Sequence, residues 1–186
     1  DHKFLKIDTP PFDSIPPTSA NLAKQILDDS VPLFADLKAR PVACYLEDTD
    51  RTAATAFANG RIEEHHWLEF SAARSTRSPH LSEKENIELF GPAASSSGHG
   101  HNYRLRVTLG GEYNSDMGTL VSYDKSHDAL GTFRDLVDHK NLNVDVPPLA
   151  QFPMTTESLA RFAYQRLQTE LPVARVQLFE LDNFFA

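Results

Sequence analysis

The chain contains one passage written twice. Residues 1–23 (DHKFLKIDTPPFDSIPPTSANLA) and residues 138–160 (DHKNLNVDVPPLAQFPMTTESLA) align without a gap at a spacing of 137 residues, and 11 of the 23 positions are identical. Repetition at a fixed spacing indicates that one structural unit occurs more than once. The sequence therefore predicts that residues 1–58 are the C-terminal half of a first unit and that residues 61–186 are a complete second unit.

The first unit starts inside the repeated motif, because Asp1 is already the first residue of that motif. We therefore expect the front half of the first unit to be missing from this sequence, lying upstream or on another chain. The small and polar stretch Arg51–Gly60 (RTAATAFANG) is a reasonable junction between the two units.

The composition excludes several classes of protein. A net charge of -8 argues against a nucleic-acid partner, because binding a phosphate backbone needs clustered lysines and arginines. No apolar run reaches the length that spans a bilayer. The only cysteine, Cys44, excludes an internal disulfide and suits a reducing compartment, so we expect a cytoplasmic protein. Cys44 lies in an apolar strand-like run and is expected in the core.

Hydrophobic periodicity predicts the elements of the second unit. Alternating apolar residues predict a half-buried strand over His101–Glu112, and Trp67 and Phe70 anchor a partner strand over Ile62–Phe70. The remaining predicted elements are helices over Ser122–Val137 and Thr155–Leu171, a strand over Val173–Leu181 and a weak strand over Gly118–Ser122. The first unit keeps only a helix over Thr18–Asp29 and a strand over Val42–Asp48.

This order of elements predicts an α+β fold, with an antiparallel four-stranded sheet and two helices on one face. The other face and the edges of such a sheet need cover, because an open edge presents unpaired backbone groups. We therefore expect the protein to form oligomers.

His99 and His101 are the first candidate site residues, in the motif GHGHNY (98–103). Residues two apart on a strand point to the same side, so both imidazoles can meet one metal ion. A catalytic zinc needs three protein ligands, and spacing alone supplies no third one. The alternative interpretation is a polar turn.

The pair Asp138–His139 is the second candidate, and it recurs as Asp1–His2. A carboxylate beside an imidazole can orient it for proton transfer near neutral pH. The same pair can also satisfy backbone groups at a helix end, and a structural turn would be duplicated as readily as a catalytic one.

Glu180 is the third candidate, because it shares strand parity with the apolar Val176 and Leu178. A carboxylate on an apolar face is costly to bury unless it is paired, and two adjacent N–H donors of a heterocycle would satisfy it. Glu47 holds the equivalent position in the first unit. The alternative is an exposed glutamate at the end of a strand.

Together these motifs resemble the 6-pyruvoyl-tetrahydropterin synthase family. The stretches that carry the resemblance are FSAA (70–73), ENIELFG (85–91), GHGHNY (98–103), Met117–Gly118, DHKNLNVDVP (138–147), TTESLA (155–160) and FELDN (179–183). The resemblance implies the T-fold, or tunnelling fold, whose units assemble into barrels and bind pterin-like rings at subunit interfaces. It also implies a homo-oligomer, a trimer or hexamer of T-fold units.

The resemblance further implies a zinc held by three histidines and a cysteine before the HGHN motif. His99 and His101 match the last two ligands, whereas the first ligand position holds Arg74 and the cysteine position holds Ala93. Zinc is therefore doubtful in the second unit. The missing front half of the first unit could supply the zinc and the cysteine instead.

The other functional positions of the family are retained. Asp138–His139, repeated as Asp1–His2, matches the catalytic pair, and Glu180 and Glu47 match the pterin-anchoring glutamate. The pocket-lining motif is kept as Thr155, Thr156 and Glu157, but the first unit reads Thr18-Ser19-Ala20 and lacks the acidic member.

The resemblance therefore implies a lyase that acts on 7,8-dihydroneopterin triphosphate and eliminates triphosphate. Two alternatives remain open. One is a catalytically degenerate domain that binds a pterin or only completes the barrel, which the loss of a ligand and the cysteine favours. The other is an enzyme like 6-carboxytetrahydropterin synthase, which has the same fold and similar residues.

Overall fold

The computed structural model describes residues 3–186, so Asp1 and His2 lie outside the described residues. The chain divides into two compact lobes. The first lobe runs up to Trp67 and includes Thr108–Tyr123, and the second comprises Leu68–Val107 and Asp124–Ala186. Strands β3 (Ile62–Arg74) and β4 (His99–Gly110) contribute residues to both lobes.

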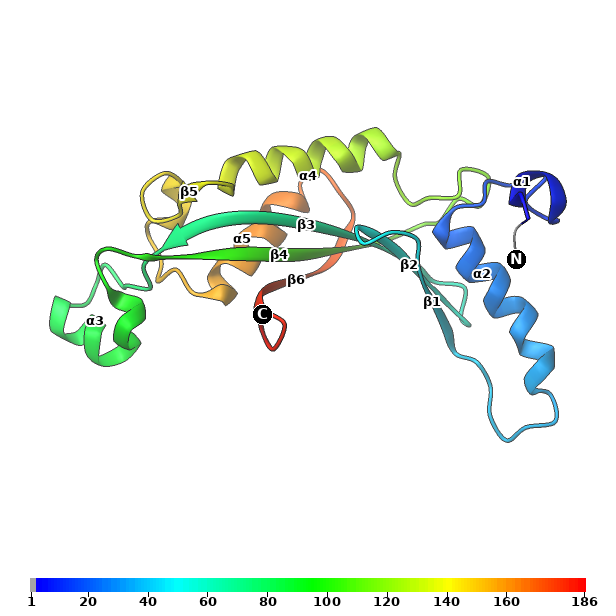
Figure 1. The fold of residues 1–186 in the computed structure, drawn as a ribbon, viewed down its shortest axis with the longest axis horizontal. Helices are drawn as coiled ribbons and strands as arrows, with labels where there is room; N and C mark the ends of the chain where they lie inside the picture. The colour runs from blue at the N-terminus through cyan, green and yellow to red at the C-terminus, as the bar shows by residue number, and fades with distance from the viewer. Residues whose placement is uncertain (1–2) are drawn as a thin grey trace. The chain divides into compact units, whose positions relative to one another are not determined.

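The first lobe is a sheet covered by one helix. Strands β1 (Ala43–Glu47), β2 (Thr52–Phe57) and the start of β3 pair antiparallel, and helix α2 (Ser19–Ser30) lies beside β1 and β2 (Figure 1). The core of this lobe is built mainly from small side chains. Its buried members are Ala20, Ala23, Leu27, Ala54, Ala56 and Ile62. The short elements α1 (Leu5–Asp8) and η1 (Val31–Phe34) flank α2.

The predicted polar junction at Arg51–Gly60 is instead mostly strand β2. Ala53, Ala54 and Ala56 are at most 3% exposed. Small side chains suit this position because they let α2 approach the sheet closely. Cys44 packs partly buried against the same core, and this burial raises the pKa of its thiol.

The second lobe joins the rest of β3 and β4 to β6 (Val173–Leu181) and β7 (Phe184–Phe185), in the order β3-β4-β6-β7. Helices α4 (Tyr123–Val137) and α5 (Thr156–Leu167) pack against this sheet. Phe133 of α4 contacts both Phe70 of β3 and Phe162 of α5, at centroid distances of 6.2 and 6.3 Å. The core therefore lies between the sheet and these two helices, as the α+β pattern predicts.

Besides β2, the predicted elements match the observed ones closely, with three further corrections. The weak strand at Gly118–Ser122 is wrong, since this part of the described chain forms only an isolated bridge between Asn114 and Thr119. Helix α5 ends at Leu167, before a turn, rather than at Leu171. A helix that periodicity did not predict, α3, covers Glu83–Phe90. The remaining short elements are η2 (Gly91–Ala94), β5 (Lys140–Asn141), which pairs parallel with β3, and η3 (Pro147–Leu149).

The helix at the end of the repeated passage has matching bounds in the two copies. Helix α2 spans Ser19–Ser30 and α5 spans Thr156–Leu167, so each boundary recurs 137 residues later. Thr18 and Thr155 are the corresponding N-caps, and each side chain accepts a hydrogen bond from the backbone three residues on. Among residues 3–186, no helix is long and apolar enough to cross a membrane.

Candidate functional site

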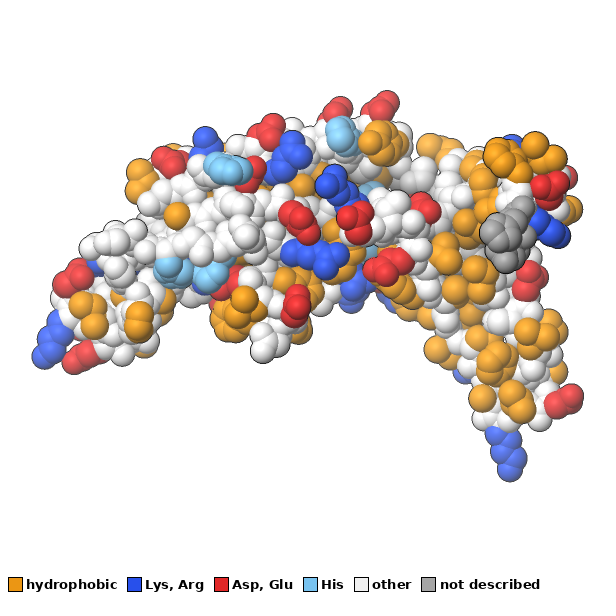
Figure 2. Space-filling model, viewed as in Figure 1, with side chains coloured by type: hydrophobic (Ala, Val, Ile, Leu, Met, Phe, Trp, Pro, Cys, Tyr) orange, Lys and Arg blue, Asp and Glu red, His pale blue; other side chains and the backbone are white. Residues whose placement is uncertain are grey.

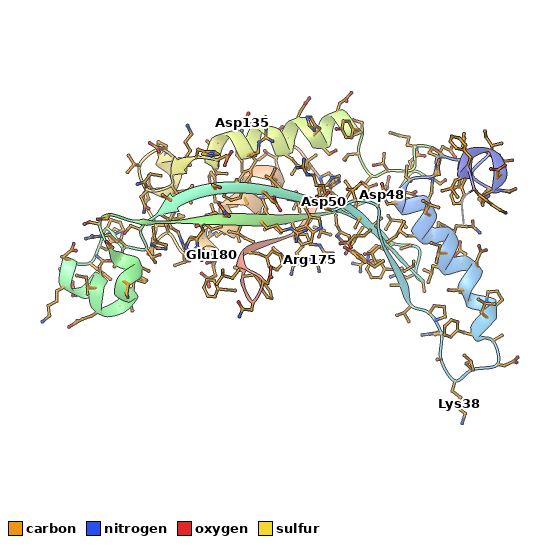
Figure 3. The ribbon with its side chains drawn as sticks, viewed as in Figure 1. Lys38, Asp48, Asp50, Asp135, Arg175 and Glu180 are labelled. Atoms are coloured by element: carbon orange, nitrogen blue, oxygen red, sulfur yellow. The ribbon has the colours of Figure 1, made fainter. Side chains whose placement is uncertain are left out.

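A buried ion pair between Arg74 and Glu180 lies at the centre of the candidate site. Arg74 ends β3, and Glu180, which is labelled in Figure 3, lies on β6. Nη2 of the arginine is 2.5 Å from Oε1 of the glutamate. Their side chains are 7% and 4% exposed. Nη1 of Arg74 donates to the carbonyl of Met154 at 2.5 Å, so both ends of the guanidinium fork are bound.

The start of α5 supports the same glutamate. The buried Thr156 donates its hydroxyl proton to Oε1 of Glu180 at 2.8 Å. Thr155 instead caps the helix, with its Oγ1 3.2 Å from the backbone N of Ser158. Glu157 is exposed, and hydrogen bonds from the Thr155 side chain and its own backbone lower its pKa. Of the three predicted pocket residues, only Thr156 contacts Glu180.

His99 and His101 lie side by side at the start of β4, as strand alternation predicts. Their ring centroids are 4.9 Å apart and the rings meet edge to face. Nε2 of His101 is 3.7 Å from Oε2 of Glu180. Burial lowers the pKa of His99, and the nearby His101 and Arg74 lower it further. The two imidazoles therefore border the Arg74–Glu180 pair.

These residues do not fit a metal ion. The position that would complete the ligand set holds Arg74, whose guanidinium has donors only and stays protonated. His80 is exposed in a turn, where its backbone N bonds to Ser78 Oγ at 3.3 Å. Within residues 3–186, no group of three or more histidines, cysteines, aspartates or glutamates is placed to hold a metal.

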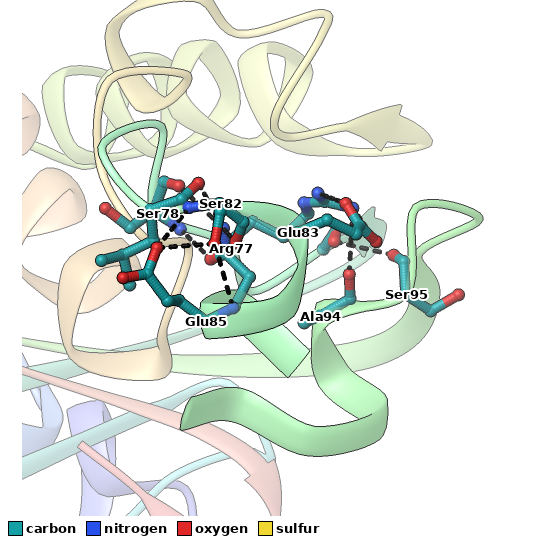
Figure 4. Close-up of polar contacts among 10 residues, drawn as sticks. Arg77, Ser78, Ser82, Glu83, Glu85, Ala94 and Ser95 are labelled. Carbon is teal, nitrogen blue, oxygen red and sulfur yellow. Dashed lines mark hydrogen bonds and ion pairs between the residues drawn. The ribbon is translucent and has the colours of Figure 1, made fainter. Parts of the chain in front are cut away.

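The segment that carries Ala93 is fixed against the end of β3. The carbonyl of Ala93 accepts a hydrogen bond from the backbone N of Thr76 at 2.8 Å, and Arg77 donates to the carbonyl of Ala94 (Figure 4). Arg77 is itself held by an ion pair with Glu83. The methyl group of Ala93 offers no nucleophile at this position.

Gly98 allows this segment to approach β3 before the histidines begin. Its φ is +69°, and an added Cβ would stand 3.1 Å from the carbonyl oxygen of Arg74. A side chain at this position would therefore be strained and crowded, so the close approach depends on glycine.

Asp138 and His139 follow α4 and are tied to β3 through Ser71. Asp138 Oδ1 accepts a hydrogen bond from the backbone N of Ser71 at 2.8 Å, and Oδ2 lies 3.0 Å from His139 Nδ1. The backbone N of His139 donates to the carbonyl of Ser71 at 2.6 Å. The Ser71 hydrogen bond is the largest cause of the lowered pKa of Asp138. The imidazole of His139 is 82% exposed and available to a ligand.

An open cavity of about 460 Å³ lies beside this pair. Residues His101, His139 and Lys140 all line this cavity. The full lining is Ser71, Ala72, Ala73, Gly100, His101, Asn102, His139, Lys140 and Asn141. Glu180 is not among these residues, so the predicted anchor and the predicted acid–base pair do not line the same cavity.

Thr18 and Glu47, two of the predicted site residues of the first unit, lie in the first lobe. Thr18 caps α2, and Glu47 is exposed on β1, where it accepts a hydrogen bond from the Tyr45 hydroxyl at 3.0 Å. Ser19, the counterpart of Thr156, donates its hydroxyl proton to Asp48 at 3.4 Å and not to Glu47. Asp1 and His2 fall outside the described residues.

Sequence reasoning missed three contributors to the site. Met154 contributes only a backbone carbonyl, which no side-chain pattern indicates. Ser71 positions Asp138 and His139 through its backbone. The sequence indicated Ser71 as a member of the family motif FSAA (70–73) but did not indicate these contacts. Lys140 follows the Asp138–His139 pair in the sequence, but its place in the cavity lining was not predicted.

Comparison with known proteins identifies the family to which this chain is similar. The family described as 6-pyruvoyl tetrahydropterin synthase matches residues 65–186. The chain is 38% identical over 120 residues to the 6-pyruvoyl tetrahydrobiopterin synthases of Pongo abelii and Homo sapiens, covering 62% of this chain and 83% of each relative. The solved structure of Caenorhabditis elegans 6-pyruvoyl tetrahydropterin synthase superposes with a TM-score of 0.65 at 30% identity, covering 68% of this chain and 93% of that one.

Proposed function

Because the chain belongs to the 6-pyruvoyl tetrahydropterin synthase family, we propose that it is a pterin-biosynthesis lyase of that type. Its substrate would be 7,8-dihydroneopterin triphosphate, with triphosphate as the leaving group. The observation that carries the proposal is the Asp138–His139 pair beside an open cavity, held by Ser71 at the position where the family motif places its acid–base pair.

In this proposal His139 moves the proton. Asp138 holds Nδ1 of the imidazole at 3.0 Å, which leaves Nε2 as the nitrogen that accepts a proton from the substrate. The negative carboxylate stabilises the imidazolium that results. Lys140 lines the same cavity and would supply positive charge for a phosphate group.

Zinc is not assigned to the second unit, because Arg74, His99 and His101 do not form a ligand set. A second candidate function follows from the same observation. The domain would bind a pterin without turnover, because Ala93 carries no thiol, or would only complete a barrel, because Arg74 neutralises Glu180.

We also propose that the two copies of the repeat are two units of one barrel. The matching bounds and caps of α2 and α5 support this organisation. Apolar side chains exposed on the first lobe support a homo-oligomer, and Figure 2 shows hydrophobic side chains gathered there. The exposed members on α2, η1 and β1 and in the segments next to them are Ile26, Val31, Leu33, Leu37, Val42 and Tyr45.

The lyase proposal is tested by adding 7,8-dihydroneopterin triphosphate to the purified chain and measuring released triphosphate. We expect H139Q to slow release by about 100-fold or more, which is the contribution of one general acid–base group. H80Q is the matched control, because His80 is exposed and lies outside the cavity. Binding of the substrate without any release would support the second candidate and reject the lyase.

A further inference from the structure

We propose that the Arg74 side chain occupies the site of the second unit and prevents both a metal ion and the N–H donors of a pterin ring from binding there. The inference rests on the proposed function only in taking Glu180 as the position that would anchor a pterin ring. The guanidinium supplies the positive charge that a metal ion would bring to the site, and it supplies one of the N–H donors that a pterin ring would bring to Glu180.

The hydrogen bonds of Glu180 are the first argument. Its Oε1 already receives Arg74 Nη2 at 2.5 Å and the Thr156 hydroxyl at 2.8 Å. Its Oε2 lies 3.7 Å from Nε2 of His101. A heterocycle that offers two adjacent N–H groups needs both carboxylate oxygens, so it can bind Glu180 only after Arg74 has left Oε1.

Charge is the second argument. Arg74 cannot lose its proton in a protein, and its side chain is 7% exposed beside His101 and Glu180. A divalent cation placed between His99 and His101 would therefore meet a buried positive charge in place of a third ligand. The same arginine both removes the ligand and repels the metal.

Three polar atoms left without partners are the third argument. Arg74 Nε, His101 Nε2 and Tyr103 Oη are buried in the described structure with no hydrogen-bond partner. Buried polar atoms are normally paired. Arginine therefore fills the site without satisfying its surroundings, as expected where one side chain stands in for a ligand with more polar contacts.

The test uses Co²⁺ as the probe, because tetrahedral cobalt has a visible absorption spectrum. The purified full chain and the variants R74H and R77H are titrated with Co²⁺ alone. We expect R74H to bind one Co²⁺ per chain, with binding lost in R74H/H99N, while the wild type and R77H bind none at the site. R77H is the matched control, since it adds a histidine at a nearby arginine that pairs with Glu83 instead.

Two results would overturn the proposal. One is a wild-type chain that binds one Co²⁺ through His99 and His101, and the other is a folded R74H that binds none. If R74H fails to fold because Glu180 is left unpaired, R74H/E180Q removes that buried charge and gives the same two outcomes.

A second titration tests the pterin half of the proposal with biopterin. R74Q should bind it about tenfold or more tightly than the wild type, a difference that R74Q/E180Q should abolish. Equal affinity of R74Q and wild type would overturn this half. Both titrations measure binding without turnover, so their failure is distinct from failure of the lyase proposal.

Discussion

The Oδ2 atom of Asp138 lies 3.0 Å from Nδ1 of His139, an imidazole that is otherwise 82% exposed. The other oxygen of the same carboxylate is held by the backbone of Ser71 at 2.8 Å. One carboxylate thus fixes an exposed imidazole to the edge of β3, and several expectations follow from this geometry and from the rest of the chain.

Removing the Asp138 carboxylate should lower the stability of the folded protein and remove the contact that holds the His139 imidazole. We expect D138A to lower the free energy of unfolding by about 1 kcal/mol, because the Ser71 amide loses a charged acceptor at a partly exposed site. Urea denaturation measures this change. D135N is the control, since Asp135 is 74% exposed and contacts only its neighbour Arg134. Equal effects of the two variants would contradict the expectation.

The same carboxylate predicts a pH dependence. The pKa of Asp138 is lowered in the folded protein, so the folded state favours the charged form more than the unfolded state does. Its contribution is complete above the unfolded value near 3.8 and is lost as the pH falls through the lower folded value. The stability difference between wild type and D138A should therefore shrink at acid pH, which denaturation at pH 6 and pH 3 can measure.

The Arg74–Glu180 pair should show strong energetic coupling. R74Q or E180Q alone should cost about 3–5 kcal/mol, because either change leaves a buried charge unpaired. The double variant R74Q/E180Q should cost clearly less than the sum of the single changes. Denaturation of all four proteins gives the coupling energy, and additive effects would show that the pair is not formed.

Gly118 should tolerate no side chain. Its φ is +71°, and an added Cβ would stand 2.8 Å from the side chain of Thr18, which caps α2. G118A should therefore destabilise the protein by about 1 kcal/mol more than G60A. Gly60 also has a positive φ, of +85°, but has open space around its Cα. Thermal unfolding of the two variants separates backbone strain from crowding, and equal melting temperatures would argue against the Thr18 contact.

His66 should make the fold sensitive to mild acid. Burial lowers its pKa, and its Nε2 atom has no hydrogen-bond partner in the described structure. The unfolded chain therefore takes up a proton first, near pH 6.5, and stability falls as the pH drops below that value. Denaturation at pH 7.5 and 5.5 should show a smaller loss for H66Q than for the wild type. H80Q, at an exposed histidine, should keep the wild-type loss.

Periodicity predicted the elements that bury a face. Leu105, Val107 and Leu109 alternate on β4 and are fully buried, as the pattern indicates. It failed at α3, where Ile87 and Leu89 are exposed, although the capping box formed by Ser82 and Glu85 was a usable signal. Periodicity also failed at β2, because its alanines and threonines are typical of a linker. The alanines that face α2 are buried in the folded chain because this helix packs on them.

The site was predictable where a motif carries the chemistry and not where a contact joins distant residues. The neighbours Asp138 and His139 contact each other, as their positions suggest. The partner of Arg74 was not predictable, because β6 and the Met154 carbonyl come close to it only in the folded chain. The sequence was enough to show that Arg74 holds the first metal-ligand position of the family. It was not enough to show that the same arginine pairs with Glu180.

Strands β2 and β3 are consecutive in the chain, and only residues 58–61 separate them. Closing so short a loop costs little entropy. The loop also sets the effective concentration of one strand at the other, whatever the concentration of the protein. If β2 and β3 belonged to separate chains, their pairing would be lost on dilution, because the two chains would diffuse apart. Here both strands belong to one chain, so the sheet of the first lobe should persist at concentrations where any larger assembly has already dissociated.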